Sequence, residues 1–152
     1  MRTRTLLTVA AVCALAIGCS SSGRSGGGSK VTGKVTFNGN PVANARVIFT
    51  DGNATGMPSG PSAFTDESGA YALVGVKPGA YKVVVYKLIP KKGMTIPADE
   101  EGGMDLVQLE ASGVGTHGLP LKYSRVANTT LTAQVESGSN EADFKLTGTA
   151  GQ

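Results

Sequence analysis

The sequence predicts an all-β fold, a seven-stranded Greek-key sandwich that follows an N-terminal export signal and a flexible linker. Seven short segments alternate apolar and polar side chains, and residues typical of turns separate them. No amphipathic helical pattern follows the first 18 residues. The 22 glycines among 152 residues, about twice the average share, suit a fold with many tight turns.

The first predicted strand covers residues 31–37, where Val, Gly, Val and Phe alternate with polar side chains. Residues 38–41 (NGNP) are typical of a turn, because Asn and Gly tolerate a positive φ. A second alternating strand follows at 45–50. Three Gly and two Pro residues make 51–61 a loop, and a short third strand is predicted at 63–65.

Two further turns separate the next pair of predicted strands. Residues 66–69 (DESG) turn into a fourth strand at 71–73, and 77–79 (KPG) turn into a fifth strand at 81–86. The fifth strand has apolar side chains on both faces, so we expect it at the centre of a sheet.

The region from 88 to 122 interrupts this regular alternation. Its three Pro and six Gly residues predict a long irregular insertion, with one short strand at 105–111. The alternation resumes in strands six and seven, at 130–135 and 143–146, with a turn at 137–140 between them.

Residues 1–18 combine two early arginines with an apolar run of about a dozen residues, which is typical of an export signal and too short to span a membrane. The end of this run, Ala16-Ile17-Gly18-Cys19, resembles the lipobox of bacterial lipoproteins. That resemblance implies cleavage before Cys19 and acylation of its thiol, so that Cys19 anchors the chain to a membrane. The alternative is an ordinary secretory signal that is cleaved nearby.

Residues 19–29 are rich in Ser and Gly and are predicted to form a linker, which leaves 30–148 as one domain. Cleavage of the signal leaves 12 basic against 11 acidic residues, and the scattered charges argue against nucleic-acid binding. Since Cys13 leaves with the signal and Cys19 is acylated, no disulfide is expected.

Two motifs resemble carboxypeptidase regulatory-like domains. They are VTGKVTFNGNPVANARVIF at 31–49 and TDESGAYALVGVKPGAYKV at 65–83. The resemblance covers residues 31–87 and implies a transthyretin-like (prealbumin-like) sandwich. The closing segments resemble short envelope lipoproteins of planctomycete bacteria. In the turns we expect Asp66 to accept backbone hydrogen bonds and Gly69 to supply a positive φ, which are structural roles.

The sequence offers no catalytic or metal-binding set of residues, and we predict no enzyme activity, metal or cofactor. His117 is the only histidine, and no free Cys accompanies it, which argues against a zinc site. The segment that starts at Asp51 resembles the front of a calcium loop, but the twelfth position, Ser62, lacks the required acid. Three acids at 99–101 are typical of a solvated charge run.

We therefore expect a non-catalytic, lipid-anchored module of the bacterial cell envelope that binds a protein or a surface, with its oligomeric state left open. By the lipoprotein resemblance, Ser20 after Cys19 favours the outer membrane. The candidate binding surface is the insertion. Its candidate residues are Lys91, Lys92, Met94, Met104 and His117.

Two alternatives remain at this stage. The first is an enzyme-associated domain, because regulatory-like domains often accompany catalytic ones, although no catalytic domain is attached here. The second is an accessory carbohydrate-binding domain whose aromatic platform would come from Tyr71, Tyr81, Tyr86 or Tyr123. The absence of Trp makes such a platform poorly supplied.

Overall fold

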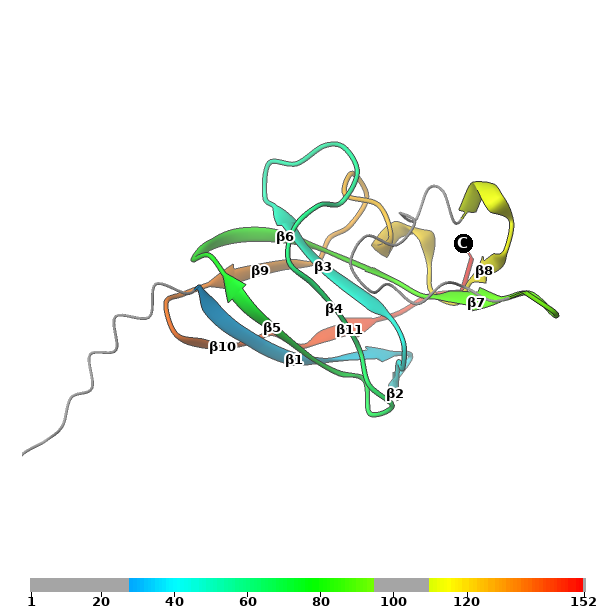
Figure 1. Ribbon diagram of the computed structural model, residues 1–152, viewed down its shortest axis with the longest axis horizontal. Helices are drawn as coiled ribbons and strands as arrows, with labels where there is room; N and C mark the ends of the chain where they lie inside the picture. Colours follow the sequence, from blue (N-terminus) through cyan, green and yellow to red (C-terminus); the bar gives the residue numbers. More distant parts are fainter. Residues whose placement is uncertain (1–27, 95–109, 152) are drawn as a thin grey trace, which may run out of the picture.

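The computed structural model describes residues 28–94 and 110–151. Two β-sheets enclose the main core, and a two-stranded ribbon extends from one end of them (Figure 1). This arrangement confirms the predicted all-β sandwich. Each strand buries one row of side chains between the sheets, as the alternating sequence pattern requires.

The first sheet is built around β1 (Ser29–Phe37). On one side β1 pairs antiparallel with β5 (Ala70–Val76) and, at its end, with β2 (Asn40–Pro41). On the other side it pairs in parallel with β10 (Ser139–Glu141) and then with β11 (Phe144–Leu146). The last part of the domain therefore closes the sheet along the first strand.

The second sheet is antiparallel and has the order β4-β3-β6-β9. Its strands are β4 (Ser62–Phe64), β3 (Arg46–Asp51), β6 (Gly79–Tyr86) and β9 (Thr132–Val135). The strand predicted at 81–86 lies in β6, between β3 and β9. This inner position agrees with the expectation drawn from its two apolar faces.

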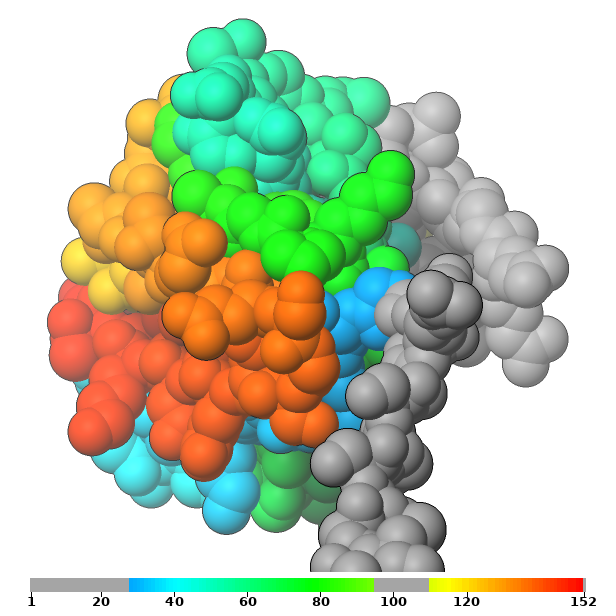
Figure 2. Space-filling model, turned by 90° about the vertical axis from the view of Figure 1, so that its left-hand side faces the viewer, coloured from blue at the N-terminus to red at the C-terminus, as the bar shows by residue number. Residues whose placement is uncertain are grey.

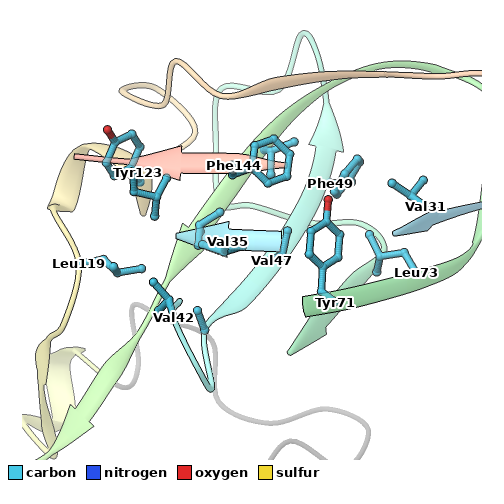
Figure 3. Packing of buried hydrophobic residues seen from close by; sticks show 14 of the residues in the cluster. Val31, Val35, Val42, Val47, Phe49, Tyr71, Leu73, Leu119, Tyr123 and Phe144 are labelled. Atoms are coloured by element: carbon cyan, nitrogen blue, oxygen red, sulfur yellow. The ribbon is translucent and has the colours of Figure 1, made fainter. Parts of the chain in front are cut away.

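The main core lies between these two sheets, and Figure 3 shows its side chains converging from both. Phe49 is fully buried, and its ring centroid lies 5.7 Å from Tyr81, 6.2 Å from Phe144 and 6.4 Å from Tyr71. Such tilted contacts are the arrangement that aromatic pairs prefer. The valines of β1, β3 and β6 that were predicted to face inward surround this aromatic cluster.

A second, smaller core lies on the outer face of the second sheet. It consists of Ile48, Val84, Tyr86 and Val126, all at most 6% exposed. Val126 belongs to the segment between the ribbon and β9, and it covers the apolar outer faces of β3 and β6. This packing explains why those two strands are buried on both faces.

Three sequence predictions need correction. The predicted turn at 137–140 overlaps β10, because Ser139 and Asn140 pair with β1. The linker was predicted to end at residue 29, yet Ser29 already belongs to β1 and is buried. The insertion at 88–122 is not wholly irregular. It contains β7 (Leu88–Pro90), β8 (Gly115–His117) and the 3-10 helix η1 (Leu121–Tyr123).

The strand predicted at 105–111 is not supported where the structure describes it, because residues 110–112 are helical. The remainder of that segment lies outside the described residues. So do the signal at 1–18, Cys19, and the candidate residue Met104.

Candidate binding surface

Strand β1 runs from one end of the sandwich to the other. At the start of β1, Ser29 Oγ donates a hydrogen bond to the carbonyl of Glu136 at 2.6 Å. The other end of β1 points toward the β7–β8 ribbon (Figure 1), and Phe37 there lines a pocket together with Ile89 and Gly118. Nine residues at about 3.3 Å each separate the two ends by roughly 30 Å. We call the second one the distal end and define it as residues 37–42, 87–94 and 110–125.

The ribbon presents most of the candidate residues that the structure describes. Gly118 N–H donates to the carbonyl of Lys87 at 2.8 Å, and Lys91 N–H donates to that of Val114 at 2.9 Å. These bonds hold β7 against β8. The turn that follows β7 exposes Lys91, Lys92 and Met94 to solvent.

A groove lies between the ribbon and the turn that joins β1 to β2. Its volume is about 280 Å³. Ile89 is 47% exposed and contributes one apolar wall. Asn38 in the opposite turn is held in place, since its side chain bonds the carbonyl and the N–H of Gly148. The groove is lined by Phe37, Asn38, Asn40, Pro41, Val42, Lys87, Ile89, Gly118 and Leu119.

His117, a candidate residue of the binding surface, is mostly buried. Its side chain is 17% exposed, and its Nε2 lies 3.0 Å from Glu110 Oε1. The other carboxylate oxygen of Glu110 accepts a hydrogen bond from Arg125 Nη2 at 2.6 Å. Sequence reasoning missed Glu110 and Arg125, because no local pattern marks a contact that joins residues 110, 117 and 125.

This cluster is a cross-link between loops and is a poor metal site. A guanidinium beside the carboxylate competes with a cation, and one imidazole with one carboxylate is too few ligands. Among the described residues, no three His, Cys, Asp or Glu side chains gather to hold a metal ion.

Basic and acidic side chains are unevenly distributed between the distal end and the rest of the described residues. Segments 87–94 and 110–125 carry five basic side chains and one acidic side chain, Glu110, whereas the other described residues carry six of each. The net positive charge of the described chain therefore comes from the distal region. The sequence of 95–109, outside the described part, adds Asp99, Glu100, Glu101 and Asp105.

The four candidate tyrosines do not form an aromatic platform. Tyr71, Tyr86 and Tyr123 are at most 6% exposed, and the Tyr71 hydroxyl donates to the carbonyl of Ala142 at 2.7 Å. Burial, with a smaller contribution from the charge of Asp143, raises the pKa of Tyr71. Tyr81 is half-buried against Phe49. This burial contradicts the proposed stacking role of these residues.

The turn motifs have the structural roles that the sequence predicted. Asp66 Oδ1 accepts hydrogen bonds from Ser68 N–H at 2.8 Å and from Ala70 N–H at 2.9 Å. These bonds, and first the one from the Ser68 hydroxyl, lower the pKa of Asp66. Gly69 has a φ of 76°. Asp51 Oδ1 likewise accepts from Asn53 N–H at 2.8 Å, which caps a turn in the segment considered as a calcium loop.

A second hollow lies near the other end of the sandwich, where Figure 2 shows the 51–60 loop above the start of β6 and β9. Its volume is about 790 Å³. Asn53, Lys77, Lys82, Thr132 and Gln134 contribute polar groups to its lining, and Pro78, Ala80, Tyr81 and Ala133 contribute apolar ones. Like the distal groove, this hollow therefore combines polar and apolar surface.

The described residues contain no helix long and apolar enough to cross a membrane. The sequence matches the family model of the carboxypeptidase regulatory-like domain over residues 30–110. No curated protein matches the chain.

One similar solved structure is a DUF3823 family protein from Parabacteroides merdae. The two chains are 14% identical with a TM-score of 0.38, and the match covers 79% of this chain and 46% of that one. Less than half of the neighbour is thus represented in this chain.

Proposed function

Since the chain belongs to the carboxypeptidase regulatory-like domain family, we propose that it is a non-catalytic binding module, anchored by lipid at Cys19 in the bacterial cell envelope. The observation that carries the proposal is the placement of the ribbon. Figure 1 shows β7 at the end of the sandwich opposite the start of β1, and the candidate residues Lys91, Lys92 and Met94 are exposed directly after β7. An anchored N-terminus would therefore direct these residues away from the lipid surface.

The chemistry of the distal end supports binding over catalysis. His117 is engaged with Glu110, and Glu110 also pairs with Arg125, so these side chains cross-link loops. Exposed lysines and methionine beside a groove instead provide a surface for a partner.

Anchoring and binding are tested together in the native envelope. The intact mass of the exported protein should exceed that of the chain from residue 19 by the acyl groups, and Cys19→Ala should remove this excess and release the protein from membranes. A photo-crosslinking residue at position 92 should capture a neighbour that the same residue at position 77, on the opposite end, does not capture. An unmodified mass, or equal capture at both positions, contradicts the proposal.

A second candidate function, glycan binding, is favoured by the hollow near the start of β6, whose lining includes several polar side chains. Lys82, Asn53 and Gln134 offer hydrogen-bond donors to a saccharide. If this function holds, Gln134→Ala will abolish retention of the soluble chain on envelope glycan, and Lys92→Ala will leave it unchanged.

A further inference from the structure

We propose that the distal groove binds an extended segment of another envelope protein in which an apolar side chain lies next to a carboxylate. This inference rests on the proposed function and names the chemistry of its partner. It concerns the groove between the β1–β2 turn and the β7–β8 ribbon, and nothing in the family match assigns a role to this place.

The size and lining of the groove suit an apolar side chain. Its volume of about 280 Å³ lies just below the range of small-molecule pockets, which begins near 300 Å³, and suits a single side chain. Phe37, Leu119 and Ile89 line it from separate elements, and Ile89 leaves nearly half of its surface exposed. Burying that surface under a partner is favourable at roughly 25 cal/mol per Å².

Gly118 keeps the groove open on the ribbon side. A Cβ at this position would lie 3.1 Å from Cδ1 of Ile89 and 3.4 Å from Cγ of Lys87. A side chain here would occupy the space between the two residues that supply the apolar wall and the charge. The absence of a side chain at 118 is thus part of the shape of the site.

Lysines of the ribbon explain why the ligand should carry a carboxylate next to its apolar side chain. Lys87 lines the groove, and Lys91 and Lys92 follow on the same ribbon. None of these three lysines forms an ion pair with another described residue, and Glu110 already pairs with Arg125. Among the described residues, the ammonium group of Lys87 is thus available to a carboxylate of the partner, which favours acidic over basic partners.

The backbone favours recognition through side chains. Pro90 has no N–H, so a partner strand could not form a continuous ladder along the outer edge of β7. An added strand would normally gain its affinity from such a ladder. Binding at this site therefore depends on the apolar contact and on the lysine charge.

The probe is a fluorescein-labelled peptide, Gly-Leu-Glu-Gly-Leu-Glu-Gly, titrated into the chain from residue 19 carrying Cys19→Ala. We expect saturable binding that weakens with salt. Ile89→Ser should weaken it about tenfold through the lost apolar contact, and Lys87→Glu should weaken it severalfold through charge repulsion. Peptides with Lys for Glu, or Ser for Leu, should bind at least about tenfold more weakly.

Matched control variants distinguish binding in the groove from nonspecific binding elsewhere on the surface. Val74→Ser removes a side chain that is 77% exposed on β5, and Lys30→Glu reverses an exposed charge at the start of β1. Both should leave peptide affinity unchanged. Amide chemical shifts should move at residues 87–89 and 118–119 when peptide is added, which tests the site even if one variant fails to fold.

Several results would overturn the inference. They are no saturable binding of the Leu-Glu peptide, equal binding of the Lys peptide, or equal losses in the control variants. Dimerisation that Ile89→Ser abolishes would show that a second copy occupies the groove. If the peptide bound more strongly after Asp99→Asn, Glu100→Gln and Glu101→Gln, the chain's own acidic residues would be the occupant that competes for the groove. Because these measurements use the unanchored chain, they are independent of acylation and of capture in the envelope.

Discussion

The sandwich body and the distal end use different interactions. Thirteen of the sixteen buried residues of the main core, Phe49 among them, lie in the body, where acidic and basic side chains balance. At the distal end, Lys87 and Ile89 line a groove, and Lys91, Lys92 and Met94 are exposed on the turn after β7. The body thus supplies most of the stability, whereas the distal end keeps apolar and charged groups accessible, which is the arrangement expected of a scaffold that carries a binding surface.

The largest expected effect tests the body. Phe49→Ala removes the ring that contacts three other aromatic rings in the main core, and should lower the free energy of unfolding by about 3–5 kcal/mol. Urea denaturation followed by circular dichroism measures this change. The control Val74→Ala, on an exposed side chain, should change it by less than about 0.5 kcal/mol. Equal losses in both variants would contradict the division between core and surface.

A pair of glycine substitutions compares the two regions directly. A Cβ at Gly33 would lie 1.8 Å from the backbone oxygen of Ala142, so Gly33→Ala must separate β1 from the chain between β10 and β11. We expect a loss of about 1–3 kcal/mol or more. Gly118→Ala would meet only side-chain atoms, those of Ile89 at 3.1 Å and of Lys87 at 3.4 Å, and should cost less than about 1 kcal/mol. If Gly118→Ala lowered the urea midpoint more than Gly33→Ala, the ribbon would be the more rigid region.

The second core makes a smaller contribution. Val126→Ala shortens a fully covered side chain in a cluster of four residues and should cost about 1–2 kcal/mol. Amide hydrogen exchange should then increase near 84–86, which Val126 covers. An increase confined to β1 and β5 instead would mean that the two cores are not separate units.

The smallest effect concerns the turn before β5. Hydrogen bonds to the carboxylate lower the pKa of Asp66, so this group stabilises the folded state above about pH 4 and loses that contribution as the pH falls through its lowered pKa. Asp66→Asn should therefore reduce Tm slightly at neutral pH and less in acid. Glu67→Gln, an exposed substitution in the same turn, should show no such difference. A Tm gap for Asp66→Asn that is constant with pH would reject the carboxylate role.

The candidate site was only partly predictable. The sequence singled out the insertion and its exposed Lys91, Lys92 and Met94, because Pro and Gly interrupt the strand pattern there. It gave no sign that Phe37 and Ile89 would line one groove, since 52 positions separate them in the chain. The pairing of His117 with Glu110 was equally hidden, because a contact between loops leaves no periodic pattern.

The sequence by itself determined the class of fold, the seven alternating strands and the structural turns at Asp66 and Gly69, because local side-chain alternation and turn chemistry specify them. Only the tertiary structure decided that 139–146 pairs in parallel with β1, that Val126 covers the second sheet, and that a groove opens beside the ribbon. The physical reason is that these features depend on contacts between distant segments, and alternation within one segment carries no information about which partner it will meet.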